Sequence, residues 1–279
     1  MLLKFYGLLW YVSSISLTIL YKTIGYLHLN LFITSSSFFL QTILVSCYLK
    51  KVPSFEYSKE LVYVVLILSS FILVCNFSLQ IISIHLLVIS KSITPILTLI
   101  FTERKLKNLL PFIVIGIGLY LSNTKSELHD TLIEYLLMII VTIITTLKFP
   151  ILKKYFELFP DITTIQFLNQ ILFVMGIISF PFGMYQLYTV EITEPETLLI
   201  GFLLGTFLSL FISIGEYTII HFNTIIDTVF IDIFKQVLLI VISGFTNSLE
   251  LINWLGITLI LTVILDFKLK NKIEPIELP

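Results

Sequence analysis

The chain has 279 residues, of which 57% are hydrophobic and only 13% are charged. A soluble domain is about 45–50% apolar. With a mean hydropathy of +1.02, the composition excludes a soluble globular protein and predicts an all-α polytopic membrane protein. The net charge of −1 provides no basic surface for nucleic acid, which is therefore not expected as a partner.

Ten apolar runs near the length of a membrane-spanning helix follow one another along the chain. The third and fourth are separated at Ser83, because one helix over residues 61–102 would be much longer than a bilayer is thick. Pro181 lies inside the seventh run and predicts a kink or a tilt there. The ten predicted spans are roughly residues 5–21, 29–49, 61–80, 84–102, 109–122, 132–147, 162–189, 198–220, 224–245 and 251–267.

The basic residues predict the orientation of these spans. With ten spans and a cytosolic N-terminus, 13 of the 17 Lys and Arg residues fall in cytosolic segments, and Lys148 is counted among them. Lys22 and Lys125 fall on the other side, whereas Lys91 and Lys235 lie within predicted spans. This asymmetry follows the positive-inside rule, so both termini are predicted to be cytosolic.

The fourth span carries a lysine near its middle. Lys91 is its only formal charge, and a lysine at this depth costs about 2.5–3.5 kcal/mol on insertion scales. We therefore expect Lys91 to face a partner or a water-filled cavity. Thr94 and Thr98 follow on the same helical face, and Pro95 removes a backbone hydrogen bond one turn after the lysine.

The residues around Lys91 belong to a pattern that covers residues 76–119. It consists of Asn-x-Ser-Leu, Lys-Ser-x-x-Pro-x-x-Thr, a glutamate that closes the helix, and Leu-Leu-Pro-x-x-x-x-Gly-x-x-Leu. This pattern resembles the triose-phosphate and nucleotide-sugar transporters of the drug/metabolite transporter superfamily. The matching residues are Asn76, Ser78, Leu79, Lys91, Ser92, Pro95, Thr98, Glu103, Leu109, Leu110, Pro111, Gly116 and Leu119.

The resemblance continues in the ninth and tenth spans, from the segment D-I-F-K-Q-V-L-L-I-V-I-S-G-F that begins at Asp232. In that family, paired lysines of the fourth and ninth helices contact the phosphate groups of the substrate. The resemblance therefore implies this role for Lys91 and Lys235. Two midplane cations also suit a phosphorylated solute chemically, because its charge must be neutralised while its water is removed.

The eighth and ninth spans also contain acidic groups. Thr228 and Asp232 share a helical face with Lys235. Asp232 is therefore either part of a substrate site or a structural counter-charge that neutralises the lysine within its own helix. Glu216 and Asp227 either complete ion pairs or carry a coupling proton, if burial raises their pKa.

Other polar positions carry weaker signals. Asn76 and Gln80 share one face of the third span, where they line the cavity or bond to neighbouring helices. Cys47 and Cys75 have no metal or disulfide spacing, so we predict them as core residues. The sequence contains no nucleophile, metal-ligand or paired-acid motif, so no enzyme activity, metal or cofactor is predicted.

A faint internal repeat relates the two halves of the chain. Placing Lys91 over Lys235 aligns the fourth span with the ninth, and the segments that begin at Gly116 and Gly256 then fall within a few residues of each other. This predicts a five-plus-five duplication, with repeats of about 1–130 and 131–270, inside a single transmembrane domain over 1–279. Since five is odd, the repeats would be inverted and the site would lie at the midplane.

Several positions depart from the family pattern. Gln236 follows the ninth-span lysine where many relatives have arginine, which weakens a bidentate phosphate clamp. Ile225 and Asp227 replace a proline and a threonine early in that helix, and Tyr21-Lys22 stands where relatives have Asn-Lys. The identity of the substrate is therefore not carried over from the family.

The function predicted from these observations is that of a secondary transporter. It would be an antiporter that exchanges a phosphorylated solute, such as a nucleotide-sugar or a sugar or triose phosphate, across an endomembrane. Its partners would be that solute, a counter-substrate and the lipid bilayer, and the sequence leaves a homodimer open. The run that begins at Phe5 lacks a cleavage site and no transit peptide precedes it, so the Golgi or endoplasmic reticulum is expected rather than a plastid.

Two other interpretations remain open at the level of sequence. The first is a proton-coupled permease for a neutral or cationic metabolite on the same fold. The second is a membrane scaffold, which would tolerate the loss of both midplane lysines.

Overall fold

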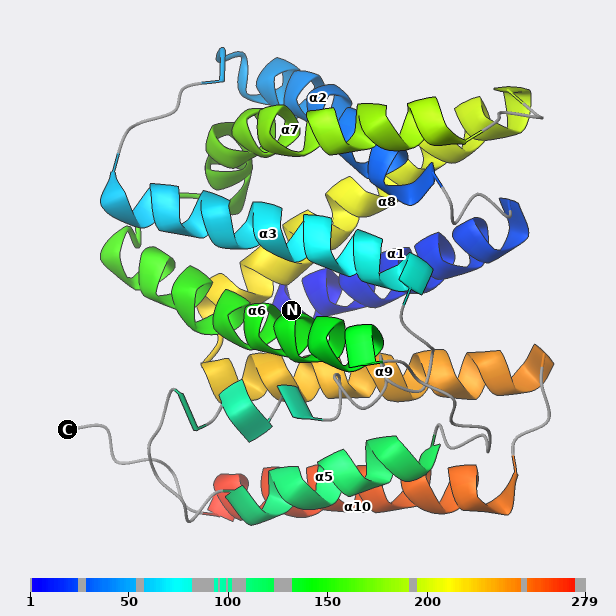
Figure 1. Ribbon diagram of the computed structural model, residues 1–279. Coiled ribbons are helices and arrows are strands. Elements are labelled where there is room, and N and C mark those ends of the chain that lie inside the picture. Colours follow the sequence, from blue (N-terminus) through cyan, green and yellow to red (C-terminus); the bar gives the residue numbers. More distant parts are fainter. Residues whose placement is uncertain are drawn as a thin grey trace. The chain divides into compact units, whose positions relative to one another are not determined.

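The chain is helical throughout the part that the computed structural model describes, with no strand in that part (Figure 1). The described residues are 2–24, 29–53, 58–81, 93–94, 96–98, 100–101, 109–122, 132–190, 195–246 and 250–273. The helices are α1 (Leu2–Ile24), α2 (Asn30–Leu49), α3 (Lys59–Ile81), α5 (Leu109–Ser122), α6 (Leu132–Leu158), α7 (Thr164–Thr189), α8 (Pro195–Phe222), α9 (Ile225–Thr246) and α10 (Leu251–Ile273).

Five stretches in the described part are long and apolar enough to cross a membrane. The predicted all-α class is confirmed, and helices of this length and apolarity fit a multi-pass membrane protein. They coincide with the second, third, sixth, seventh and eighth predicted spans. These stretches are Leu31–Leu49, Lys59–Ser78, Leu132–Leu158, Thr164–Thr189 and Pro195–Phe222.

The remaining predicted spans correspond to shorter or less completely described elements. Shorter apolar stretches of α1, α5 and α10 match the first, fifth and tenth spans, and α9 matches the ninth. Most of the fourth span lies outside the described residues. Cys47 is exposed and Cys75 is only partly buried, so the prediction that both are core residues is wrong for Cys47.

The sixth helix is longer than the sequence indicates. The predicted span ends at residue 147, whereas α6 continues to Leu158 and contains Pro150. Lys148 is therefore part of the helix and is buried, rather than part of a cytosolic connection. The helix continues because the apolar residues Phe149 and Leu152 beyond the lysine are buried in the core.

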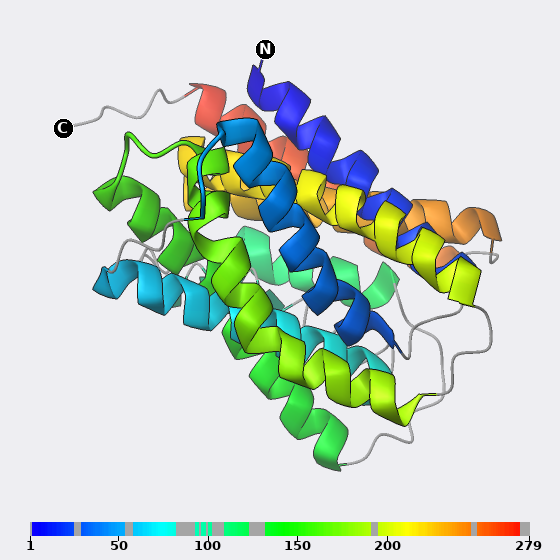
Figure 2. The same cartoon turned by 90° about the horizontal axis from the view of Figure 1, so that it is seen from above.

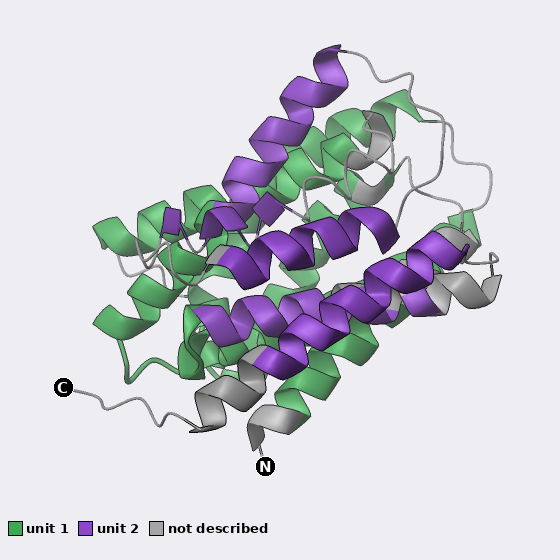
Figure 3. Ribbon diagram, turned by 90° about the horizontal axis from the view of Figure 1, so that it is seen from below, with its two compact units in different colours: residues 1–81, 147–225 green, residues 82–146, 226–279 purple. Residues whose placement is uncertain are grey.

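The chain forms two compact units (Figure 3). Unit 1 comprises residues 1–81 and 147–225, and unit 2 comprises residues 82–146 and 226–279. Each unit thus combines segments from both predicted repeats.

Unit 1 contains α1, α2, α3, α7, α8 and the end of α6. Within it, α2 packs against α7 and α1 against α8 (Figure 2). Its core is apolar and draws on five helices, among which close packing provides the stabilisation. Examples of its buried residues are Phe38 of α2, Leu68 of α3, Phe156 of α6, Phe167 of α7 and Leu210 of α8.

The contact between α2 and α7 combines close backbone approach with a hydrogen bond. A Cβ atom at Gly183 would lie 3.0 Å from the Phe32 Cα atom and would overlap the Ser35 hydroxyl oxygen, so glycine allows the two backbones to approach closely here. The backbone N–H of Phe32 donates to Oε1 of Gln186 over 2.9 Å. Since the first N–H groups of a helix have no partner within it, Gln186 satisfies one of these donors of α2.

Unit 2 contains α5, α9, α10 and the first part of α6. α5 packs along α10 (Figure 1), and Nδ2 of Asn253 donates to the carbonyl oxygen of Leu121 over 3.2 Å. Phe112 of α5 and Phe230 of α9 bring their ring centroids to 5.0 Å. The ring contact places α9, which carries Lys235, beside α5 in this unit.

Candidate functional site

An ion pair lies in the middle of α9. The Lys235 ammonium and the Asp232 carboxylate are 2.7 Å apart, and the two side chains are 17% and 20% exposed. Lys235 is ten residues from Ile225 and eleven from Thr246, the ends of the helix. In a helix that spans a bilayer, this position is close to the centre of the hydrocarbon layer.

The geometry of this pair bears on the two interpretations of Asp232. The predicted counter-charge within the helix is present, because Asp232 and Lys235 are three residues apart and face each other. Thr228 lies one turn before Asp232 and is buried. The Thr228 hydroxyl, the carboxylate and the ammonium therefore follow one another along one face of α9.

The two threonines predicted to follow Lys91 are buried in unit 2. Oγ1 of Thr98 donates to the carbonyl oxygen of Thr94 over 2.8 Å, a common bond of a helical threonine to the preceding turn. Both side chains are buried. Lys91 itself lies outside the described residues, so its predicted meeting with Lys235 stays a prediction.

The remaining predicted residues are distributed between the units. Asn76 of α3 is partly buried in unit 1, and its Nδ2 donates to the carbonyl oxygen of Ile72 over 2.8 Å. Asp227 is exposed in the first turn of α9, where the helix dipole favours a negative charge. Glu216 is buried in α8, so Asn76 and Glu216 are in unit 1 and the other described candidates are in unit 2.

Glu216 forms a second ion pair, one of the two roles that the sequence left open for it, and the partner is a lysine that the sequence analysis placed in a cytosolic segment. Its Oε1 lies 2.6 Å from Nζ of Lys148 on α6, and the two side chains are 7% and 10% exposed for lysine and glutamate. The partners are 68 residues apart. This pair therefore links two helices, whereas the pair on α9 lies within one helix.

Aromatic rings complete the surroundings of the Lys148 ammonium. Nζ lies 4.4 Å from the ring centroid of Phe71 on α3 and 5.7 Å from that of Phe149. Such rings attract a cation through their negative faces, yet they exclude water. A buried pair in this environment has a large desolvation cost, which its mutual attraction and hydrogen bond have to offset.

Two sequence signals point to this pair in retrospect. The run Phe149-Pro150-Ile151-Leu152 continues the apolar span beyond Lys148, so the lysine does not mark its end. Glu216 lies in an otherwise apolar helix and needs a counter-charge. The proximity of Lys148 to Lys153 and Lys154 concealed this, because three lysines in a short segment indicate a cytosolic connection.

The chemistry available within the helices is therefore that of charge pairing. Lysine and carboxylate groups can bind ions of opposite charge or exchange protons. Within the described ranges, no three His, Cys, Asp or Glu side chains come together as a metal site would require.

Comparisons with known proteins find no matching family model and no matching curated protein. The transporter family indicated by the sequence pattern thus stays a resemblance.

Proposed function

We propose that this protein is a secondary transporter, an antiporter that exchanges a phosphorylated solute across an endomembrane. The observation that carries the proposal is the Asp232–Lys235 pair halfway along the apolar helix α9. Ionisable groups at membrane depth are costly and usually belong to a substrate or ion pathway. A pair that is about one-fifth exposed is also more accessible than a sealed structural pair.

The arrangement on α9 suits an exchange mechanism. In the empty carrier, Asp232 keeps the Lys235 ammonium paired at membrane depth. An ammonium has three donors, so a phosphate group can bind Lys235 beside the carboxylate or take its place. In the empty carrier, the charges of the site have no substrate to compensate for their loss of water when the site closes. The substrate-bound form therefore changes between its two access states more readily than the empty form, which favours exchange over net transport.

The pattern of helix contacts supports a five-plus-five inverted repeat. If each helix corresponds to the helix five places later, the pairs α2·α7 and α5·α10 correspond to themselves. Under the same rule, α2·α8 corresponds to α3·α7, and both of these pairs are in contact. Likewise, α2·α3 corresponds to α7·α8, and both of these pairs are also in contact. The pair α1·α8 would correspond to α6·α3, between which the Lys148 ammonium contacts the Phe71 ring; these two helices do not pack along each other as α1 and α8 do.

This correspondence is what a two-fold axis between inverted repeats would produce. The proposed protein therefore has ten spans in one transmembrane domain, with the site near the midplane. Its N- and C-termini are cytosolic by the positive-inside rule, and its membrane is that of the Golgi or endoplasmic reticulum.

A trans-stimulation assay in proteoliposomes tests the exchange. Vesicles are preloaded in turn with inorganic phosphate, nucleoside monophosphates, triose phosphates and hexose phosphates, and uptake of labelled solute is measured. We expect one class to stimulate uptake and Lys235→Ala to abolish it, because the phosphate loses its cation. Lys154→Ala, at an exposed position of α6, is the matched control and should transport normally. Exchange by Lys235→Ala at the normal rate would contradict the proposal.

A proton-coupled permease is the second candidate, favoured by the buried Lys148–Glu216 pair. A carboxylate with little access to water is suited to carry a coupling proton if the transport cycle separates it from its lysine. The same vesicles distinguish the two mechanisms. Uptake into empty vesicles under a pH gradient, without counter-substrate, would select the permease over the antiporter.

A further inference from the structure

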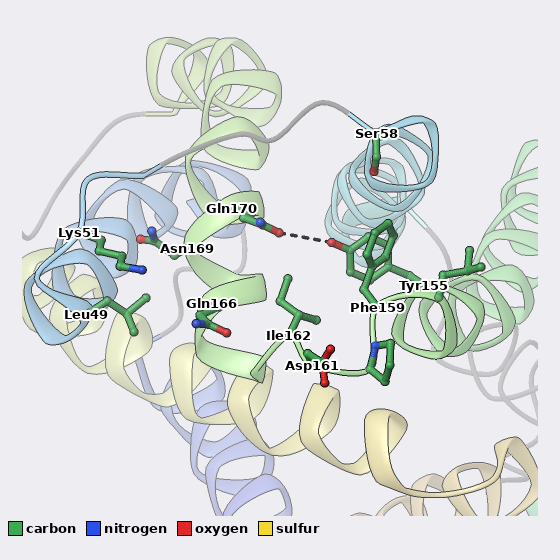
Figure 4. A pocket seen from close by; sticks show the side chains of 12 residues that line it. Leu49, Lys51, Ser58, Tyr155, Phe159, Asp161, Ile162, Gln166, Asn169 and Gln170 are labelled. Carbon is green, nitrogen blue, oxygen red and sulfur yellow. Dashed lines mark hydrogen bonds between the residues drawn. The ribbon is translucent and has the colours of Figure 1, made fainter.

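A polar pocket of about 550 Å³ lies where α2 and α6 end and α7 begins, within unit 1 (Figure 4). This volume is within the range of small-molecule sites. Part of its wall is apolar and formed by Leu49, Leu158, Phe159 and Ile162. The polar part includes three side-chain amides and a lysine, all of which can donate hydrogen bonds.

The first of these donors is the amide of Gln166. Its Oε1 accepts from the backbone N–H of Thr163 over 2.9 Å as part of a capping box at the start of α7. A backbone N–H can only donate, so this contact fixes the oxygen of Gln166 on the cap. The amide NH₂ group is therefore the end that remains for the pocket.

Two further amides on α7 also accept a hydrogen bond through their oxygen, in these cases from a hydroxyl group. Oδ1 of Asn169 accepts from the Ser46 hydroxyl over 2.9 Å, and Oε1 of Gln170 accepts from the Tyr155 hydroxyl over 3.3 Å. The NH₂ groups of these amides have no hydrogen-bond partner among the described residues. Asn169 is buried as a residue, but its Nδ2 atom is not among the fully buried atoms that lack a partner, so this donor is accessible from the pocket that Asn169 lines.

A cation completes this set of donors. Gln166, Asn169 and Gln170 share a face of α7 because they are three and four residues apart. Lys51, which is exposed just after the end of α2, also lines the pocket and has no ion pair in the described part of the chain. Figure 4 shows Lys51, Asn169 and Gln166 on the same side of α7, with the lysine side chain directed towards that helix.

We propose that this pocket binds the phosphate group of a phosphate ester. Three amide NH₂ groups and an ammonium supply more donors than the two oxygens of a carboxylate accept well, whereas a phosphate offers additional acceptor oxygens. The apolar wall accommodates the organic part of the ester. This chemistry is shared by the headgroup of a phospholipid and by a soluble phosphate ester.

The proposal is independent of the transport function, since none of its residues belongs to the ion pairs of α9 or of α6 and α8. Binding can be measured on purified protein without any transport. Two probes distinguish the sources of the phosphate. Glycerol 3-phosphate is titrated by calorimetry against lipid-free protein in detergent, and retention of phosphatidic acid is followed by native mass spectrometry.

Two substitutions test the donor set without disturbing the fold. Lys51→Ala removes the cation at an exposed position and should weaken binding about tenfold, the effect of losing one hydrogen bond to a charged group. Gln166→Glu retains the oxygen that completes the capping box but replaces the NH₂ donors by a negative charge, so binding should be lost while the thermal midpoint is unchanged. Lys154→Ala is the control and should bind normally.

A third variant should act in the opposite direction. Asp161 also lines the pocket, and its carboxylate repels a phosphate, so Asp161→Asn should strengthen binding. Binding of glycerol 3-phosphate supports the proposal and identifies a soluble ester, whereas retention of phosphatidic acid alone supports it and identifies a lipid. If neither probe binds, or if Lys51→Ala and Gln166→Glu bind normally, the proposal is overturned.

Discussion

Lys148 and Glu216 show how a charged residue can be accommodated inside an apolar bundle. Both side chains are buried, and each charged group contacts the other in place of water. The ring of Phe71 lies over the lysine ammonium. Buried pairs of this kind rarely add net stability, but breaking one leaves an uncompensated charge. The pair therefore favours the arrangement in which α6 and α8 lie beside each other, because any other arrangement would leave one of the two charges buried without its partner.

A double substitution cycle measures this effect. Lys148→Met and Glu216→Met replace each side chain by an apolar one of similar length. Each single change should destabilise the protein by about 3–5 kcal/mol, because the remaining charge is buried without its partner. The double variant should regain most of this loss, since no charge remains. The thermal midpoint in detergent, followed by tryptophan fluorescence, measures all three variants.

The matched control for this cycle is Lys154→Met, which changes an exposed lysine on the same helix and should leave the thermal midpoint almost unchanged. A double variant as unstable as the sum of the two single variants would show that Lys148 and Glu216 do not act as a pair.

Helix pairs in this protein approach closely at glycine positions. In unit 2, a Cβ atom at Gly256 of α10 would lie 2.5 Å from both the Gly118 carbonyl oxygen and the Ser122 nitrogen of α5. In unit 1, a Cβ atom at Gly215 of α8 would lie 2.9 Å from the Tyr6 carbonyl oxygen of α1. Since lipid is as apolar as the side chains, close contact of this kind drives association of helices in a membrane.

Gly256→Ala should therefore destabilise the packing of α5 on α10. The new methyl group would meet backbone atoms on both sides, which cannot move without separating the helices. Overpacking of this kind costs about 1–3 kcal/mol, more than alanine gains over glycine in helix propensity. The yield of monodisperse protein in size-exclusion chromatography and its thermal midpoint should both fall.

Gly7→Ala provides the comparison on another helix. Its Cβ atom would meet only Cδ1 of Ile219, at 3.9 Å, which is an ordinary contact. The change should be neutral or slightly stabilising, because alanine favours the helix. Equal behaviour of the two alanine variants would argue against close backbone packing at Gly256.

At the scale of the whole molecule, the apolar runs of the sequence predicted the helices well. Run length and hydropathy depend on the local sequence alone, so α2, α3, α7 and α8 begin and end near their predicted positions. The end of α6 was missed, because the partners that bury Lys148 are distant in sequence. A pairing between residues so far apart in the sequence cannot be predicted from either residue alone. The pairing of Asp232 with Lys235 could be anticipated, because the two residues are one helical turn apart.

The polar pocket was also beyond prediction from the sequence. Its donors depend on which end of each amide is occupied, and that depends on Ser46, Tyr155 and Thr163, which lie on three different segments. No spacing in the sequence reveals this. The grouping of segments into two units that each combine parts of both predicted repeats likewise depends on contacts between helices that are distant in sequence.

The proposed ten-span topology makes a prediction that cysteine labelling can test. In a variant with Cys47 and Cys75 replaced by serine, single cysteines are placed at Val52, Asp161, Tyr188 and Glu250. Val52 and Asp161 follow α2 and α6, so in sealed microsomes with the cytosolic face outward both should react with an impermeant maleimide. Tyr188, at the far end of α7, and Glu250, just before α10, should react only after permeabilisation.

Lys51 and Asp161 line one pocket, so the connections that follow α2 and α6 lie at the same end of unit 1. Labelling of Glu250 in sealed vesicles, with Tyr188 protected, would require an odd number of spans between them and would rule out the inverted repeat.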